Sequence, residues 1–439
     1  MESISPAEFA ARRAQLLAFL ASQERPAAAV LSAHPERQRS RDTDYPYRQH
    51  SDFYYLTGFN EPNALLVLRP DSAAQQHIFV QPSDPHAEVW HGRRLGVDAA
   101  PARLGVDQAY SYEHDIEQLT ELLDGVETVF YLFDDTDLAD LLQQVGATMR
   151  RPKSGYQAAA QYGDLSTYMA QQRLYKSAAE IALLRKACSI SAEAHKRAMK
   201  ACKPGLYEYQ LAAELHYQFA YHGALSPAYG SIVGGGDNAC ILHYTENSSA
   251  LADGDLVLID AGAEYQGYAG DITRTFPVNG RFSADQAALY EVVLAAQAAA
   301  LAELRPGSTL EPAQQAAARA ITEGLLALGI LTGSLADNLE QASYKRFFIH
   351  GVGHWLGLDV HDVGTYEVNG SKRVLEPNMV LTIEPGIYIP RGLSDVDARW
   401  QGIGIRIEDD ILITADGYDN LTAAVPKTIA EIEQWMRNQ

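Results

Sequence analysis

Apolar residues recur along this chain in two rhythms, the short aliphatic runs of strands and the three-to-four-residue spacing of helices. In the first 150 residues the short runs are Ala28–Ser32, Ala64–Leu68, His77–Val80 and Thr128–Leu132. Helical patterns before and after the last of these runs predict helices over Asp115–Leu123 and Asp137–Gln144. Strands that alternate with helices predict a compact α/β module.

Helix-start signals divide the chain. Ser5-Pro6-Ala7-Glu8 offers an N-cap, a first-turn proline and an acidic third residue, which predicts an opening helix. The segment Gln157–Gln161 and the polar residues after it are typical of a connector. A capping box, Ser177 with Glu180, then begins a second series of helices. We therefore predict an N-terminal α/β domain over residues 1–170 and a second domain over residues 171–439.

Two acidic residues border a predicted hairpin in the second domain. The aliphatic run Leu256–Ile259 predicts a buried strand that ends on Asp260. The β-branched segment Asp271–Phe276 predicts its partner, and the glycine-rich stretch between them suits a turn. A symmetric hairpin would place Asp260 opposite Asp271, with Cβ atoms ~5 Å apart. Two carboxylates at that distance repel by ~3 kcal/mol at an effective dielectric of 20, so a shared proton or a cation must neutralise them.

Further acids and histidines lie among apolar residues of the same half. They are His243, His350, His354, His361, Glu384 and Glu408. In the apolar run Gly402–Ile413, alternation places Arg406 and Glu408 on one face, which leaves open a simple ion pair between them. Gly351 and Gly353 disfavour a helix, which argues against a helical two-histidine zinc motif at His350 and His354. Each histidine taken alone is also compatible with a hydrogen-bonded core residue.

Taken together, the four acids Asp260, Asp271, Glu384 and Glu408 favour a metal centre. One divalent cation would leave two of their negative charges uncompensated, whereas two cations balance all four. Carboxylate oxygens with one imidazole favour Mn²⁺, with Co²⁺ or Zn²⁺ as alternatives. Two such ions ~3.5–4 Å apart would hold a bridging water and lower its pKa towards neutrality. The residues alone therefore predict a two-metal hydrolase.

Composition excludes several other classes of protein. The formal charge of −21 disfavours nucleic acid as a partner, because phosphate binding needs a basic surface. No apolar run approaches the ~18 residues of a membrane span. Three cysteines in 439 residues argue against a disulfide framework. The expected location is cytoplasmic.

The run His350–Asp362 fits the signature of the proline peptidases at every defined position. With Tyr45–Gln49, Ser51–Phe59 and Asn420–Thr422, it makes the whole chain resemble aminopeptidase P, the Xaa-Pro aminopeptidase branch of the pita-bread metallopeptidases. The resemblance implies an α/β (α+β) fold, with a creatinase-like N-terminal α/β domain and a C-terminal pita-bread catalytic domain. It also implies attack by a metal-bridging hydroxide on peptides with proline at position 2, releasing the first residue.

Site residues follow from the same resemblance. The implied metal ligands are Asp260, Asp271, His354, Glu384 and Glu408, with Asp271 and Glu408 bridging two ions. Glu384 would also transfer the proton. The implied substrate-binding and transition-state residues are His243, His350, His361 and Arg406, and Tyr229 and Tyr388 are candidates to line a proline slot. Trp90 matches a tryptophan that lines a neighbouring subunit's site, which implies a homo-oligomer (tetramer or dimer), although a local packing role for Trp90 stays open.

Two alternatives remain at this stage. A prolidase, which cleaves only Xaa-Pro dipeptides, would use the same metals and acids. A non-catalytic binding protein could keep the fold, but such relatives typically lose metal ligands, and here every ligand position is filled.

Overall fold

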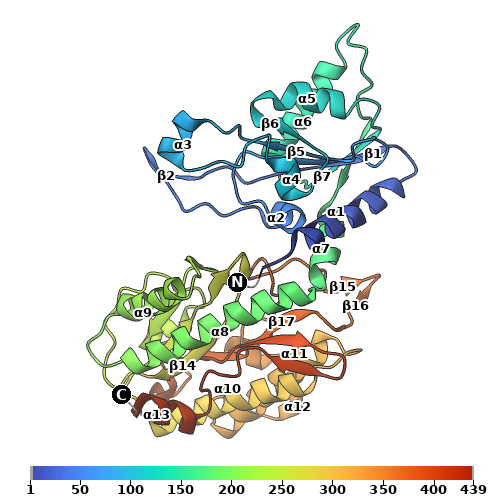
Figure 1. Ribbon diagram of the computed structural model, residues 1–439. Helices are drawn as coiled ribbons and strands as arrows, with labels where there is room; N and C mark the ends of the chain where they lie inside the picture. The colour runs from blue at the N-terminus through green and yellow to red at the C-terminus, as the bar shows by residue number, and fades with distance from the viewer. Residues whose placement is uncertain (1–2, 438–439) are drawn as a thin grey trace. The chain divides into compact units, whose positions relative to one another are not determined.

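The computed structural model describes residues 3–437, which form two compact units, Ile4–Gln172 and a second that begins at Arg173 (Figure 1). Both units mix helices with strands, as the α/β patterning predicts. Among the described residues, no helix is long and apolar enough to cross a membrane.

A six-stranded sheet forms the centre of the first unit, in the order β6-β5-β4-β1-β7-β8. The strands are β1 (Ala27–Ser32), β4 (Leu65–Leu68), β5 (Gln76–Val80), β6 (Gln108–Ser111), β7 (Thr128–Tyr131) and β8 (Gln161–Asp164). Helices α5 (Asp115–Leu122) and α6 (Thr136–Met149) cover one face, where Leu119 and Leu142 join a core with strand residues. Helices α1 (Pro6–Ala21) and α2 (Ser51–Thr57) pack against each other, and α1 also packs against β1 and β4 (Figure 1). The predicted strands and helices of this unit are confirmed, with ends that shift by a few residues.

The connector predicted after Gln157 is wrong in part. Its last residue, Gln161, begins the edge strand β8, and α7 (Ser166–Leu174) follows at once. Strand β8 carries the sequence Gln-Tyr-Gly-Asp, which is polar and mostly exposed. An edge strand of this kind lacks the alternating apolar residues by which strands are predicted, because only one of its edges and little of its surface is covered.

In the second unit, helix pairs pack around short strand systems. Helix α8 (Ala178–Ala201) packs on α9 (Glu208–Tyr221), and α10 (Ala284–Ala302) packs on α11 (Leu310–Ala327). Figure 1 shows the α8–α9 pair and the α10–α11 pair on different sides of the strands. The capping box predicted at Ser177 is present, since Ser177 accepts from the Glu180 N–H and Glu180 accepts from the Ser177 N–H.

Two antiparallel strand pairs position the acidic residues, and each pair is interrupted where an acid lies. The first joins β11 (Leu256–Asp260) to β14 (Thr273–Pro277), with β10 (Ile232–Gly235) on the other edge of β11. In the second, β17 (Val380–Ile383) and β18 (Gly386–Ile389) pair with β20 (Asp409–Ile413) and β19 (Ile403–Arg406). Glu384 lies in the interruption between β17 and β18, and Glu408 lies in the one between β19 and β20. The apolar run Gly402–Ile413, whose alternation is typical of one strand, therefore forms two strands.

The hairpin predicted between the two aspartates has a different register. Asp260 pairs with Thr273 instead of facing Asp271. The turn falls at Gln266 and Gly267, which have φ values of 50° and 86°, between β12 (Ala263–Tyr265) and β13 (Tyr268–Ala269). Two consecutive residues with positive φ are the mark of a type I′ turn, and this turn fixes the register one residue later than a symmetric centring on the sequence does.

A close approach of two glycines narrows this hairpin just beyond Asp260. A Cβ atom on Gly262 would lie 1.6 Å from the carbonyl oxygen of Gly270. Only glycine fits there, because any other side chain would collide with the opposite strand. Asp260 lies just before this close approach on one strand, and Asp271 lies just after it on the other. From α8, Ser191 accepts the Ala263 N–H and a ring nitrogen of His195 bonds the Ala261 carbonyl, which anchors the interruption to the helix.

The remaining elements are short or peripheral. They are β2 (Gln38–Ser40), β3 (Thr43–Asp44), α3 (Pro85–His91), α4 (Ala100–Leu104), β9 (Ser226–Pro227), α12 (Leu335–Glu340), β15 (Glu367–Val368), β16 (Ser371–Lys372), β21 (Tyr418–Asn420) and α13 (Ile429–Arg437).

Candidate metal centre

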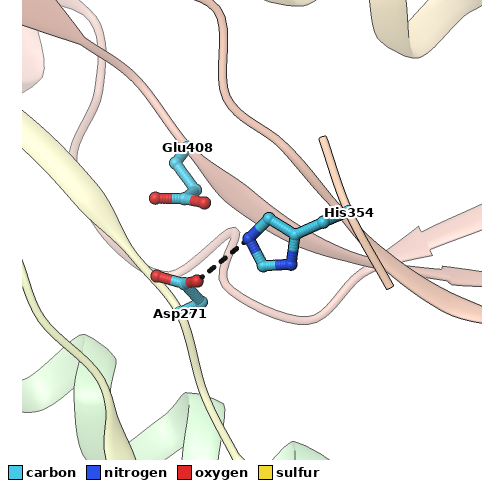
Figure 2. A group of neighbouring side chains, drawn as sticks. All are labelled: Asp271, His354 and Glu408. Atoms are coloured by element: carbon cyan, nitrogen blue, oxygen red, sulfur yellow. Dashed lines mark ion pairs between the residues drawn. The ribbon is translucent and has the colours of Figure 1, made fainter. Parts of the chain in front are cut away.

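Three of the predicted ligands converge inside the second unit. One ligand atom each from Asp271, His354 and Glu408 lies within 4.8 Å of the other two. Figure 2 shows the three side chains directed towards one another. Asp271 and Glu408 are buried, and His354 is nearly so. The group comes from three segments far apart in the sequence, brought together by the two interrupted strand pairs.

The ring of His354 is oriented as a metal ligand would be. Its Nδ1 lies 2.9 Å from the Trp355 carbonyl oxygen, which can only accept, so Nδ1 carries the hydrogen. In the neutral ring the Nε2 lone pair then faces Asp271 and Glu384, whose oxygens lie 3.5 and 3.6 Å away. A lone pair aimed at two carboxylates is stable only with a proton or a metal ion between them.

The other two predicted ligands adjoin this group. Glu384 lies beside His354, as the distance above shows. Asp260 is linked to Asp271 through Tyr229, whose hydroxyl oxygen is 2.5 Å from one oxygen of each carboxylate. One hydroxyl hydrogen cannot neutralise two carboxylates, so Tyr229 orients them but leaves most of their charge uncompensated.

Arg406 is the cation that reaches these acids, and its partner is on another strand. Its Nη2 donates to Asp260 over 2.6 Å. The alternative that pairs Arg406 with Glu408 is replaced by an indirect connection through the hydroxyl of Thr273. Alternation along one strand identifies neighbours on the same face, whereas the partner of Arg406 lies on β11, a strand of a different sheet, which the sequence of one strand does not reveal.

Burial, with too little positive charge nearby, raises the pKa values of three of these acids. Burial raises the pKa of Asp260 although Arg406 opposes the shift. Burial, with repulsion from Asp271 and Glu384, raises the pKa of Glu408 well above its usual value. Burial also raises the pKa of Glu384 to about 7. Carboxylates held together in this way fit divalent cations, because such ions supply the compensating charge and prefer oxygen donors.

The metal-free protein is expected to lose stability as pH rises from about 5 to about 9. The pKa of Glu384 in the folded protein is about 7, above the ordinary 4.5. The folded state is therefore stabilised by ~3 kcal/mol while Glu384 is protonated, and this stabilisation is lost as pH rises from 4.5 through 7. Burial alone would lower the pKa of His354, but Asp271 and Glu384 raise it to about 9 from 6.5. The stability that His354 contributes is complete below pH 6.5 and is lost through pH 9.

Bound cations replace these protons, and their affinity rises with pH. The measurement is the melting temperature from pH 5 to pH 9 with and without added metal. The increase caused by metal should grow with pH, and a metal-free melting temperature that stays level or rises would contradict the assignment.

His350 and Tyr388 form a second layer beside the acids. The Tyr388 hydroxyl accepts from Arg406 Nη1 and lies 2.8 Å from His350 Nε2, to which it donates. The other ring nitrogen of His350 lies 2.8 Å from the Gly351 carbonyl. Both nitrogens of His350 therefore have partners, and burial lowers its pKa to about 4, which keeps the ring neutral.

His243 and His361 are the other two predicted substrate-binding histidines, and both are exposed. The ring of His361 meets that of His354 edge-on, with centroids 4.3 Å apart. Although part of His361 is exposed, its ring is partly enclosed, and its pKa is lowered first by burial and then by the charge of His354. His243 lowers the pKa of both His361 and His350, so the three histidines lie close enough to one another to interact electrostatically.

Trp90 lies in the first unit, on α3, and is 76% exposed in the isolated chain. A side chain so exposed makes little contact within the chain, and both roles of Trp90, local packing and lining a neighbouring subunit's site, stay predictions.

Sequence reasoning missed the residues that hold the ligands. Arg274 is fully buried, pairs with Asp409 over 2.7 Å and donates to the main-chain carbonyls of Thr273 and Glu408. Asp410 accepts the main-chain N–H of Asp271. The available signal was the polar residues inside strands whose other residues are apolar, which indicates a need for buried partners.

The fold and the donor set define a metal-dependent hydrolase, and comparison with known proteins agrees. Residues 182–415 match the model of Metallopeptidase family M24, and residues 9–131 match that of the Aminopeptidase P, N-terminal domain. The chain belongs to metallopeptidase family M24, in its aminopeptidase P branch. The predicted pita-bread fold and hydrolase class are therefore confirmed.

Individual relatives cover the whole chain. The Xaa-Pro aminopeptidase of Escherichia coli (strain K12) is 48% identical over 443 residues, which is 99% of each chain. The solved aminopeptidase PepP of Pseudomonas aeruginosa is 47% identical with a TM-score of 0.97, over 100% of this chain and 99% of that one. A second structure, aminopeptidase P from E. coli with the inhibitor Pro-Leu, is 48% identical with a TM-score of 0.95 and full coverage of both chains.

Proposed function

We propose that the protein is an Xaa-Pro aminopeptidase, which releases the first residue of peptides that have proline in the second position. The observation that carries the proposal is the cation-requiring group of Asp271, His354 and Glu408, with ligand atoms within 4.8 Å of one another. The proline specificity is supported by the relatives, one of which is an Xaa-Pro aminopeptidase and another of which binds the inhibitor Pro-Leu.

We assign two divalent ions to this centre, with Mn²⁺ favoured over Co²⁺ and Zn²⁺ because four of the five donors are carboxylates. Asp260, Asp271, His354, Glu384 and Glu408 would hold these ions, and Asp271 and Glu408 would serve as ligands of both. When bound, the ions lower the pKa of the attacking water and polarise the scissile carbonyl group.

Glu384 is assigned the proton transfer. Its burial and its pKa of about 7 suit a group that takes a proton from the attacking water and passes it to the proline nitrogen. That nitrogen has no hydrogen in the substrate, since the bond before proline is a tertiary amide, and it must gain one to leave.

We assign the substrate-binding histidines two different roles. His361 and His243 are exposed, so each can donate a hydrogen bond to the scissile carbonyl and to the charge that develops on its oxygen. His350 has both ring nitrogens engaged, and we assign it with Tyr388 to the wall of the proline slot. Arg406 holds Asp260, and Tyr229 orients Asp260 and Asp271.

We further propose that the protein acts as a cytoplasmic homo-oligomer, a tetramer or a dimer, in which Trp90 lines the site of a neighbouring subunit. The support is the 76% exposure of Trp90 on a seven-residue helix with no buried residue. The three cysteines Cys188, Cys202 and Cys240 are free, in keeping with a reducing compartment.

A prolidase is the alternative within the same family, and an assay separates the two. The metal-loaded protein is given an Xaa-Pro dipeptide and the matching Xaa-Pro-Xaa tripeptide, and kcat/KM is compared. Comparable or faster cleavage of the tripeptide at the bond before proline supports the aminopeptidase. Cleavage of the dipeptide alone would establish the prolidase, and cleavage of neither would overturn the proposal.

A further inference from the structure

A threonine hydroxyl joins the two interrupted strand pairs at the metal centre. Thr273 begins β14, pairs with Asp260 and is fully buried. Arg406 Nε donates to its hydroxyl oxygen over 3.0 Å, and that hydroxyl lies 2.6 Å from Oε2 of Glu408. The carbonyl oxygen of Thr273 also accepts the main-chain N–H of Glu408 over 3.1 Å.

The direction of this hydrogen-bonded chain is fixed by chemistry. A guanidinium group can only donate, so the oxygen of Thr273 must accept from Arg406. Its single hydrogen is then directed at Oε2 of Glu408, which accepts it. The hydroxyl therefore fixes the rotation of the Glu408 side-chain carboxyl group.

The same chain reaches the ligands of both strand pairs. Arg406 donates to Asp260 through Nη2 and to Thr273 through Nε. Asp260, Arg406, Thr273 and Glu408 thus form one connected series between a ligand on the first pair and a ligand on the second. Partners that orient the ligands of a metal are typically worth 10–100-fold in its affinity.

We infer that Thr273 is a positioning residue of the metal centre, whose hydroxyl orients Glu408 relative to Asp260 so that both can hold divalent ions. The inference rests on the proposed metal centre and concerns metal binding, so it is tested without substrate.

Matched variants isolate the hydroxyl. Thr273→Val keeps nearly the same shape and removes the hydroxyl, whereas Thr273→Ser keeps it. Thr322→Val is the control, because Thr322 is a fully buried threonine on α11 whose hydroxyl donates to the Ala318 carbonyl of the same helix. Chelator-treated proteins are titrated with Mn²⁺ by calorimetry, and electron paramagnetic resonance records the signal of the coupled ion pair.

Thr273→Val is expected to weaken Mn²⁺ binding by about 10- to 100-fold and to diminish the coupled signal at equal metal loading. Thr273→Ser and Thr322→Val are expected to stay within about threefold of wild type. If Thr273→Val does not fold, Thr273→Ala against Thr273→Ser makes the same comparison, since both lack the methyl group.

Equal affinity of the variants with and without the hydroxyl would overturn the inference, as would an equal loss in Thr322→Val. A wild-type protein that binds no metal would overturn both the inference and the proposed function. A protein that binds metal but cleaves no proline peptide would contradict the proposed function alone.

Discussion

A Glu384→Gln variant is expected to hydrolyse a proline-second tripeptide about 100- to 10,000-fold more slowly than wild type, which is the range of a lost general base. Glutamine has the same shape and keeps an oxygen that can face a metal ion, but it cannot take a proton from water. The measurement is kcat and KM on one tripeptide, and the loss should fall on kcat, because the substrate-binding histidines are unchanged.

The fold of this variant should be intact. Burial raises the pKa of Glu384 to about 7, so its ionisation destabilises the metal-free protein at high pH, and the neutral amide removes that cost. The metal-free variant should therefore melt no lower than metal-free wild type above pH 7. Glu367→Gln is the matched control, since Glu367 forms an exposed ion pair with Lys372 and should change neither activity nor stability measurably. Retention of wild-type turnover by Glu384→Gln would remove Glu384 from the proton transfer.

Removal of metal is the second change with a large expected effect. Exhaustive treatment with a chelator should abolish peptide cleavage, because the proposed centre then lacks the charges that polarise the carbonyl and activate water. Adding back Mn²⁺, Co²⁺ or Zn²⁺ separately should restore it, with Mn²⁺ the most effective. The melting temperature should fall on removal, since a ligand at 100 times its Kd stabilises the folded state by about 2.7 kcal/mol. Full activity after verified metal removal would contradict the proposed mechanism.

Local signals along the chain predicted most of the helices and the ends of the apolar strands. The capping box at Ser177 and the N-cap at Ser5 act within one helical turn, so a short stretch of sequence contains the whole interaction. The apolar run that ends on Asp260 and the one that precedes Glu384 are buried strands. Their own aliphatic residues favour burial, so the sequence of each run predicts it. Such features need no knowledge of the rest of the fold.

Features that depend on two distant segments were predicted less well. The register that pairs Asp260 with Thr273 follows from a turn at Gln266 and Gly267, and the sequence offered several glycines as candidates. The partner of Arg406 lies 146 residues away on another strand. The edge strand β8 was not predicted, because its sequence is polar and has no apolar alternation. In each case a tertiary contact outweighs the local pattern.

The candidate ligands came from a different kind of information. Charge repulsion indicated that four buried acids need cations, and the resemblance to aminopeptidase P supplied the fifth ligand, His354, and the sharing of Asp271 and Glu408. The structure adds the orientation of His354, whose Nδ1 is engaged by Trp355 so that Nε2 faces the acids. It also adds Thr273 and Arg274, which hold the candidate ligands and whose one sequence signal is a polar side chain inside a buried strand.

The most direct measurement is the anomalous electron density of a crystal grown with Mn²⁺. The proposal predicts two strong peaks ~3.5–4 Å apart, both in contact with Asp271 and Glu408, one completed by Asp260 and the other by His354 and Glu384. Density without such peaks, with the carboxylates paired through shared protons, would show that the four acids coexist without metal and would contradict the account.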